Sequence, residues 1–424
     1  MEKMSILNKL VNNMTRLQND YKGSFSLFSV MYRGLITKGR TYACFDYETL
    51  KLLGSLLENR REILDPMSGY GTLMTYCANT GKKAYLLEIN PPAFLWQYLI
   101  HPSNKDLILT IIHRFISKVN ECYAPNVRAE CSDEWLTEEA INISISIYQS
   151  LCKITSEFIT DKILIEQTAL SILLPFVFRI STSINGDTAF VKKGGICVYY
   201  NYKTDLNFYL KQISAMLYSN LSISQVHTIN LGDCRDNVLP LNRFEAMITS
   251  PPYPNYRDYR KMFGPENYLL DQFEKRKLIS FSLPQNNVIG TNKVKGREAD
   301  IINNPVVNNF LDKLCKYKGT KKAEIDNARY YVPYFRNYFY DMELAYENIA
   351  KSLANKFEGY IIVTNNTVRN FIVPVAESII YKWNSMGYNA EEFKSTEKFH
   401  VGTKNPHTKG LKAKHSEYII KVWK

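Results

Sequence analysis

Cysteines and histidines at metal-binding spacing are missing from this sequence. The eight cysteines are scattered, no two of them form a CxxC pair, and the six histidines complete no ligand set. Structural zinc sites need closely spaced Cys and His ligands, so we expect no metal site. Reduced cytosolic thiols are the simplest interpretation of the cysteines.

Long hydrophobic runs are also missing. The most apolar stretch, ALSILLPFVFRI at 169–180, is too short to span a bilayer and contains a proline. The first twenty residues are amphipathic and charged throughout, which does not resemble a secretory signal. No long low-complexity tract is present either. We therefore expect a folded, cytoplasmic protein without a membrane segment.

Acidic residues are too few to balance the basic ones. The 424 residues include 53 Lys and Arg against 41 Asp and Glu, for a net charge of +12. A basic excess favours a polyanionic partner. The cations are mixed with aromatic rings in PNYRDYRKMFG, in GTKNPHTKGLKAKH and around YYVPYFRNYFY. That mixture suits nucleic acid better than a membrane surface, although buried tyrosines beside solvated lysines remain an alternative.

The order of the elements predicts an α/β fold divided by insertions. Residues 61–96 alternate strand, glycine turn, helix and strand, which indicates a βαβ unit and a parallel sheet. Strand-like and helix-like segments resume at 226–263 and 329–424, and these two ranges together with 61–100 form the predicted core. Residues 101–225 predict a largely helical insertion with a hairpin at KKGG, 264–328 a basic irregular region, and 1–60 a helical N-terminal segment.

Two acids and two glycines predict a nucleotide-like ligand at the first strands. In DPMSGYGT, Gly69 and Gly71 let the backbone approach a ligand, and Asp65 ends a strand where open α/β sheets bind ligands. Glu88 ends the next strand and is placed to accept hydrogen bonds from ribose hydroxyls. Position 74 is Met rather than a third glycine, which disfavours a nicotinamide cofactor.

A third acid, Asp233 in NLGDCRDN, follows another predicted strand. Two interpretations stay open for it. It accepts a hydrogen bond from an adenine amino group, or it caps the N-terminus of a helix.

The segment TSPPY at 249–253 predicts a site for a planar amine. Pro251 and Pro252 hold the backbone extended and fix the directions of the neighbouring carbonyls. Ser250 adds a hydroxyl acceptor, and Tyr253 offers a ring for stacking. Two acceptors on the hydrogens of an exocyclic amine draw it toward tetrahedral geometry and release its lone pair for attack. This chemistry needs neither a metal nor a strong base.

Together these motifs resemble the S-adenosylmethionine-dependent DNA amino-methyltransferases. DPMSGYGT resembles their cofactor loop with Met67 in place of an aromatic residue, LEIN their acidic ribose strand, and TSPPY their catalytic motif. The resemblance implies a Rossmann-like methyltransferase sheet, mostly parallel with an antiparallel last strand. It implies S-adenosylmethionine contacts at these residues: Asp65, Pro66, Gly69, Gly71, Thr72, Glu88, Asn90 and Asp233, with Phe45 upstream.

The resemblance also implies a substrate. Ser250, Pro251, Pro252 and Tyr253 would hold a base flipped out of double-stranded DNA, and Ser at the first position favours cytosine N4 over adenine N6. The predicted DNA-contacting residues are basic and follow the catalytic motif: Arg257, Arg260, Lys261, Lys293, Lys295 and Arg297.

Three other hypotheses stay open. They are an RNA amino-methyltransferase, a non-catalytic subunit of a defence or restriction complex, and an enzyme with a companion restriction nuclease. A structural α/β protein whose motifs coincide by chance is disfavoured, because four motifs fall in the right order at predicted strand ends.

Overall fold

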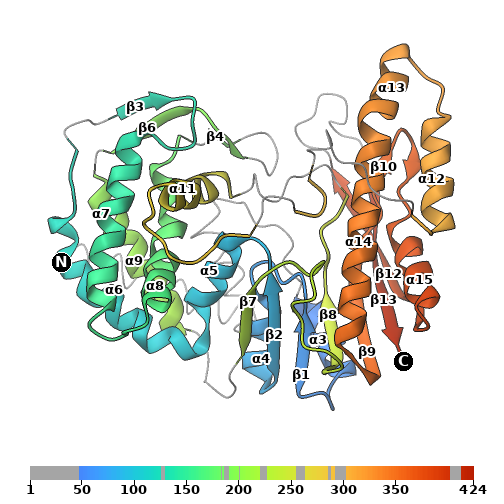
Figure 1. Ribbon diagram of the computed structural model, residues 1–424, viewed down its shortest axis with the longest axis horizontal. Coiled ribbons are helices and arrows are strands. Elements are labelled where there is room, and N and C mark those ends of the chain that lie inside the picture. The colour runs from blue at the N-terminus through green and yellow to red at the C-terminus, as the bar shows by residue number, and fades with distance from the viewer. Residues whose placement is uncertain are drawn as a thin grey trace.

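The computed structural model describes residues 47–125, 129–182, 184–185, 191–199, 201–219, 227–254, 263–284, 288–291, 302–401 and 412–424. Phe45 and the six basic residues predicted to contact DNA lie outside these ranges. Figure 1 shows a central sheet with a helical region on one side and a second group of helices on the other.

The sheet has seven strands in the order β12-β13-β9-β8-β1-β2-β7. The five strands from β9 to β7 are parallel, while β13 is antiparallel to both β9 and β12. The prediction of a mostly parallel Rossmann-like sheet with an antiparallel last strand is therefore confirmed. The strands are β1 Glu62–Asp65, β2 Lys83–Glu88, β7 Thr228–Leu231, β8 Phe244–Thr249, β9 Leu353–Thr364, β12 Asn389–Val401 and β13 Lys412–Trp423.

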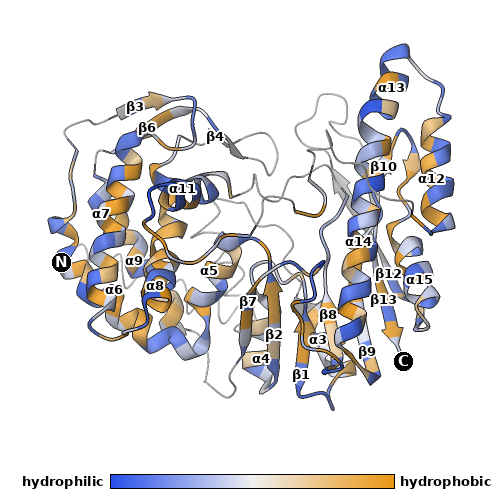
Figure 2. Ribbon diagram, viewed as in Figure 1, coloured by the Kyte–Doolittle hydropathy of each residue, from blue (hydrophilic) through white to orange (hydrophobic). Residues whose placement is uncertain are grey.

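Strand alternation gives the sheet two buried faces. In β1, Ile63 and Leu64 are both fully buried but belong to different hydrophobic clusters, as do Met247 and Ile248 in β8. Successive side chains of a strand point to opposite faces, so helices on each side are needed to cover them. In Figure 2 the central strands are accordingly coloured as apolar.

One face of the sheet shares its hydrophobic cluster with α3, α4, α5 and the helices of the 101–225 region. In that region α8 packs on both α5 and α7. The covering helices are α3 Tyr47–Leu56, α4 Thr72–Thr80, α5 Pro91–Ile100, α6 Lys105–Lys118, α7 Glu138–Thr155, α8 Lys162–Val177, α9 Tyr202–Ser219 and α11 Gly264–Lys275.

The other face is covered by α14 Val332–Ser352, α15 Val375–Ser385 and α12 Pro305–Cys315. Pro333 is the second residue of α14. A short helix, α13 Lys321–Asp326, and a π-helical turn at Asn327–Tyr331 continue into α14.

Three expectations about this architecture were wrong. The hairpin at KKGG does not form: β5 Val191–Lys192 pairs with β4 Ile184–Asn185, and β6 Gly195–Val198 pairs with β3 Ala129–Ser132. The glycines there separate two strands instead of joining them, because longer-range partners are available. The 264–328 region was expected to be irregular, yet its described part holds α11, α12 and α13.

Helix α12 shows why the second of these was missed. Its buried residues Val307, Phe310, Leu311 and Leu314 follow helical spacing, and Asn304 caps its N-terminus with Pro305 in the first turn. The sequence contains this helical pattern, but the region was interpreted from the basic residues on either side of it rather than from its apolar periodicity.

The third wrong expectation concerns length. The apolar run 169–180 is the end of a longer helical stretch, Lys162–Ile180. In the described part of the chain this is the one stretch long and apolar enough to cross a membrane. However, 67% of that window is buried inside the structure, as in a core helix.

Candidate active site

The site lies where the strand order reverses. From β1 the chain proceeds to β2 and β7 on one side, and then crosses to β8 on the other side of β1. Loops at the carboxyl ends of β1 and β8 therefore separate at this point, and open α/β sheets bind ligands in the resulting crevice. Asp65 ends β1, and Thr249 ends β8 immediately before the SPPY segment.

A cavity of about 120 Å³ occupies this position. Seven of the residues predicted from the sequence line it: Pro66, Gly69, Glu88, Asn90, Asp233, Ser250 and Pro252. The cavity thus joins the glycine loop, Glu88 at the end of β2, Asp233 just after β7, and the SPPY segment. The remaining predicted residues of the described chain are not part of its lining: Asp65, Gly71, Thr72, Pro251 and Tyr253.

The glycine loop needs both of its glycines. Gly69 and Gly71 have φ of 53° and 77°, which is left-handed backbone that other residues rarely adopt. A Cβ on Gly71 would lie 2.9 Å from Cγ of Gln97, whereas a Cβ on Gly69 would meet no protein atom within 4 Å. Gly69 thus presents bare backbone to the cavity, while Gly71 permits close packing beneath it.

Glu88 holds the glycine loop against the end of β2. Its Oε2 accepts the Gly69 N–H at 2.6 Å, and its Oε1 accepts the Asn90 N–H at 2.8 Å. Burial raises the pKa of Glu88 to about 8. The backbone N–H groups of Asn90 and Gly69 oppose that rise, and the nearby Asp65 adds to it.

Asp65 connects the glycine loop to the end of β8. Its Oδ1 accepts the hydroxyl of Thr249 at 2.8 Å and the N–H of Met67 at 3.3 Å. Burial raises its pKa to about 7, against the effect of these two donors. Its Oδ2 is buried and has no hydrogen-bond partner among the described residues. A cationic ligand would favour the ionised form of both Asp65 and Glu88.

Asp233 is not a helix cap, because the residues after it form turns rather than a helix. Arg235 binds both of its oxygens, with Nη2 to Oδ2 at 2.5 Å and Nε to Oδ1 at 3.1 Å. Arg235 also forms an ion pair with Asp341 of α14 at 3.1 Å. Burial alone would lower the pKa of Arg235, but the two carboxylates outweigh it and raise that pKa.

The SPPY segment is held by hydrogen bonds of two tyrosine hydroxyls. The Oγ of Ser250 lies 3.0 Å from the hydroxyl of Tyr253, within hydrogen-bond distance. The hydroxyl of Tyr338 on α14 donates to the carbonyl of Pro252 at 2.9 Å. Three residues of this segment are half-buried: Ser250, Pro252 and Tyr253. Pro251 between them is buried in the protein.

Sequence reasoning missed much of the apolar wall. Phe263, Val288 and Ile289 come from segments after the catalytic motif, and the ring of Tyr70 lies 5.3 Å from that of Phe263. The other lining residues not singled out are Tyr70, Ile89, Ala93, Gly232 and Cys234, whereas Met67 had been noted only as the substitute for an aromatic residue. Most of these residues lie within or next to the motifs already quoted. Their position beside a motif could therefore have indicated that they line the same site.

Gln97 was also missed, although the sequence signals it. It is the one amide in the otherwise apolar helix PPAFLWQYLI, and it is completely buried. Its Nε2 donates to the Gly69 carbonyl at 2.6 Å and to the Ser68 hydroxyl at 2.8 Å. These two hydrogen bonds fix the glycine loop from below, while Oε1 of Gln97 has no hydrogen-bond partner among the described residues.

Comparisons with known proteins add little to this geometry. No family model matches the chain, and no curated protein matches it in sequence. Two solved structures of the rRNA methyltransferase aviRa from Streptomyces viridochromogenes align over 90% and 89% of this chain and over 86% and 85% of theirs. Their identities are 8% and 9% and their TM-scores 0.28 and 0.26, so the functional argument rests on the site itself.

Proposed function

We propose that this protein transfers a methyl group from S-adenosylmethionine to the exocyclic amino group of a base in DNA, with cytosine N4 as the first choice. One observation carries the proposal: a single cavity is lined by Glu88 and Asp233 at one part and by Ser250 and Pro252 at another. Donor and acceptor of a methyl group must meet in one space, and the two sets of motifs do so here.

The residues around the cavity suit the cofactor. Gly69 leaves room at the loop, Glu88 and Asp233 offer carboxylates to ribose and adenine, and the apolar wall accepts the flat adenine ring. The buried, unpartnered Oδ2 of Asp65 complements positive charge near the methionine end. When bound, the cofactor supplies an electrophilic methyl group on a positively charged sulfur.

The chain's own residues then prepare the acceptor. Ser250 accepts one hydrogen of the target amine. Since the Pro252 carbonyl already accepts from Tyr338, we assign the second acceptor to the Pro251 carbonyl. Tyr253 holds the base flat, and the two acceptors favour the tetrahedral amine whose lone pair attacks. The methylated amine then sheds one proton to solvent.

Exposed cations support a nucleic acid as the substrate. Four lysines near α13 are exposed: Lys316, Lys318, Lys321 and Lys322. Figure 1 shows α13 beyond the carboxyl edge of the sheet, and in Figure 2 most of its ribbon has the colour of hydrophilic residues. Lys322 precedes Tyr338 by sixteen residues, which at the rise of an α-helix is roughly 24 Å. One turn of a DNA duplex is about 34 Å long. These lysines could therefore contact phosphates within one turn of a base that occupies the cavity.

The test is methyl transfer from labelled S-adenosylmethionine to unmethylated DNA, with the product nucleosides separated by mass spectrometry. Label in N4-methylcytosine supports the whole proposal, whereas label in N6-methyladenine keeps the enzyme and overturns the base. Label in RNA alone overturns DNA as the substrate. Cofactor binding without transfer to either nucleic acid overturns catalysis and leaves the non-catalytic subunit. A companion restriction nuclease remains a further prediction, testable by co-purification.

A further inference from the structure

Helix α14 contacts both halves of the site. Tyr338 donates to the Pro252 carbonyl at 2.9 Å, and Asp341, one turn further on, pairs with Arg235, which holds Asp233. Asn348, two turns beyond that, donates to the Arg235 carbonyl. These residues follow the spacing of one helical face, so a single rigid element bears on the catalytic segment and on the third acid.

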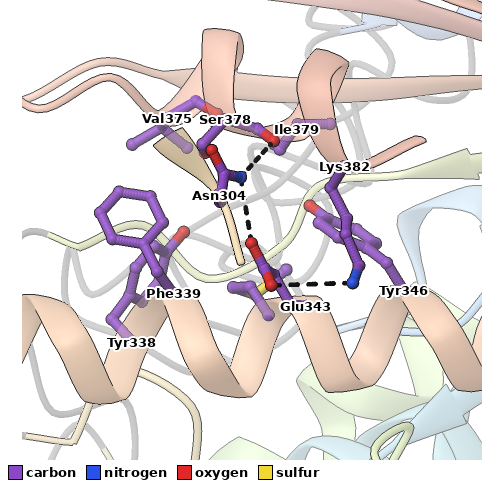
Figure 3. Close-up of a pocket in the computed structure, with 10 residues that line it drawn as sticks. Asn304, Tyr338, Phe339, Glu343, Tyr346, Val375, Ser378, Ile379 and Lys382 are labelled. Atoms are coloured by element: carbon purple, nitrogen blue, oxygen red, sulfur yellow. Dashed lines mark hydrogen bonds and ion pairs between the residues drawn. The ribbon is translucent and has the colours of Figure 1, made fainter. Parts of the chain in front are cut away.

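The helix is itself firmly held (Figure 3). Asn304 donates to Glu343 of α14 at 3.0 Å and to the Ser378 carbonyl of α15 at 3.2 Å. Lys382 of α15 lies 3.6 Å from the other oxygen of Glu343. The cavity enclosed by this network measures about 10 Å³, room for no more than about one water molecule. It is therefore a structural junction of three helices rather than a ligand site.

The Tyr338 hydrogen bond acts on a torsion that the prolines leave unset. A proline ring fixes φ but not ψ, so the orientation of the Pro252 carbonyl depends on the ψ angle of Pro252. That carbonyl belongs to the planar peptide that carries the nitrogen of Tyr253. A hydrogen bond that holds the Pro252 carbonyl therefore also fixes the position of the Tyr253 backbone, from which the ring extends.

Burial makes this hydrogen bond effective. Tyr338 is 2% exposed, and its ring packs against that of Phe339 at a centroid distance of 5.2 Å. A buried, fully packed phenol loses little freedom when it donates, and water does not readily replace it. The contact joins residues 86 positions apart in the chain, so it exists only once α14 has packed.

We propose that Tyr338 is a positioning residue for methyl transfer. It fixes the Pro252 carbonyl, and with it the Pro251 carbonyl, Ser250 and the ring of Tyr253 in the geometry that receives the target base. The inference rests on the proposed function for its catalytic meaning, but the ordering of the segment by Tyr338 stands apart from it.

The test compares Tyr338→Phe with Tyr346→Phe. Both tyrosines lie on α14 and are nearly completely buried, but the Tyr346 hydroxyl has no hydrogen-bond partner in the described part of the chain. We expect Y338F to lower kcat about tenfold at saturating cofactor and DNA, with cofactor Kd changed less than about twofold. Y346F should leave both unchanged. Equal kcat for the two variants in an active enzyme overturns the proposal.

A second readout needs no substrate. Hydrogen exchange of the peptide that contains residues 249–253 reports the amides of Thr249, Ser250 and Tyr253, since the prolines have none. We expect Y338F, and not Y346F, to speed exchange in this peptide by about tenfold or more. Unchanged exchange in Y338F would overturn the ordering role of Tyr338, and this holds whether or not the protein methylates nucleic acid. Absence of methylation by the wild-type protein would instead overturn the proposed function.

Discussion

The hydroxyl of Thr249 donates to the carboxylate of Asp65 at 2.8 Å, across 184 residues of sequence. Thr249 is the first residue of TSPPY and Asp65 the first of DPMSGYGT, so the two motifs are hydrogen-bonded to each other at their starting points. The bond is buried between the neighbouring strands β1 and β8.

Thr249→Val keeps the shape of this side chain and removes its donor. We expect a loss of about 1 kcal/mol in the free energy of unfolding, together with a further rise in the pKa of Asp65. Urea unfolding and cofactor affinity as functions of pH measure both effects. Thr155→Val is the control, since Thr155 is equally buried but its hydroxyl donates to the carbonyl of Leu151 in its own helix. An Asp65 titration that is the same in both variants would contradict the link.

Cofactor affinity should depend on pH through Glu88 and Asp65. Their pKa values are raised to about 8 and about 7, so both carboxyl groups are largely neutral below pH 6 without ligand. A positively charged ligand whose hydroxyl groups donate hydrogen bonds to Glu88 favours the ionised form of this carboxyl group. Affinity should therefore rise between pH 6 and 9, by up to about 100-fold if only ionised Glu88 binds. Calorimetric titration across this range measures it.

Glu88→Gln is the matching variant. It should bind more weakly, because one backbone N–H loses its acceptor, and should keep only the step near pH 7 that belongs to Asp65. The free energy of unfolding should change with pH in the opposite direction to the cofactor affinity, falling as pH rises. The raised pKa values stabilise the fold fully below about pH 4, and that contribution is lost as pH rises through 8. A pH profile identical to wild type would remove Glu88 from the cofactor site.

Gly71→Ala should disable cofactor binding through Gln97. The added Cβ lies 2.9 Å from Gln97 Cγ at φ 77°, so the amide that holds the Gly69 carbonyl must move. We expect a loss of about 2 kcal/mol in stability, with clearly weaker cofactor affinity. Gly81→Ala is the control: φ is 70°, but no atom lies within 4 Å of the new Cβ. It should cost about 1 kcal/mol and leave affinity unchanged. Comparable losses of affinity would mean that strain alone matters.

Ser250→Ala and Tyr253→Ala should each lower methyl transfer by roughly 100-fold while leaving cofactor affinity nearly intact, since each removes a group that orients the base. Tyr253→Phe separates the two contributions of the tyrosine. It keeps the ring and removes the hydroxyl that lies 3.0 Å from Ser250. We expect it to retain more activity than Tyr253→Ala in the same radiolabel assay. A collapse of cofactor affinity in either alanine variant would refute this division of roles.

The exposed lysines near α13 should govern nucleic-acid affinity. Replacing Lys316, Lys318, Lys321 and Lys322 by Gln should raise the KM for DNA about tenfold or more and flatten its salt dependence, with kcat unchanged. The control replaces four other exposed lysines, Lys51, Lys83, Lys153 and Lys211, which lie on α3, β2, α7 and α9. Net charge changes equally in both. Equal effects would show that only overall charge matters.

The sequence by itself determined the α/β class, the glycine turn and the acidic strand ends, because these depend on local patterns. Apolar periodicity, left-handed glycines and a proline pair each constrain only a few neighbouring residues.

Only the tertiary structure decided which motifs meet. Asp65 and Thr249 bond because β8 lies beside β1, a strand order that no local pattern specifies. The same holds for Gln97 beneath the glycine loop and for Tyr338 on the Pro252 carbonyl. The sequence supplied the groups. Burial and strand crossover brought them within hydrogen-bond distance and raised the pKa of two carboxyl groups toward neutrality.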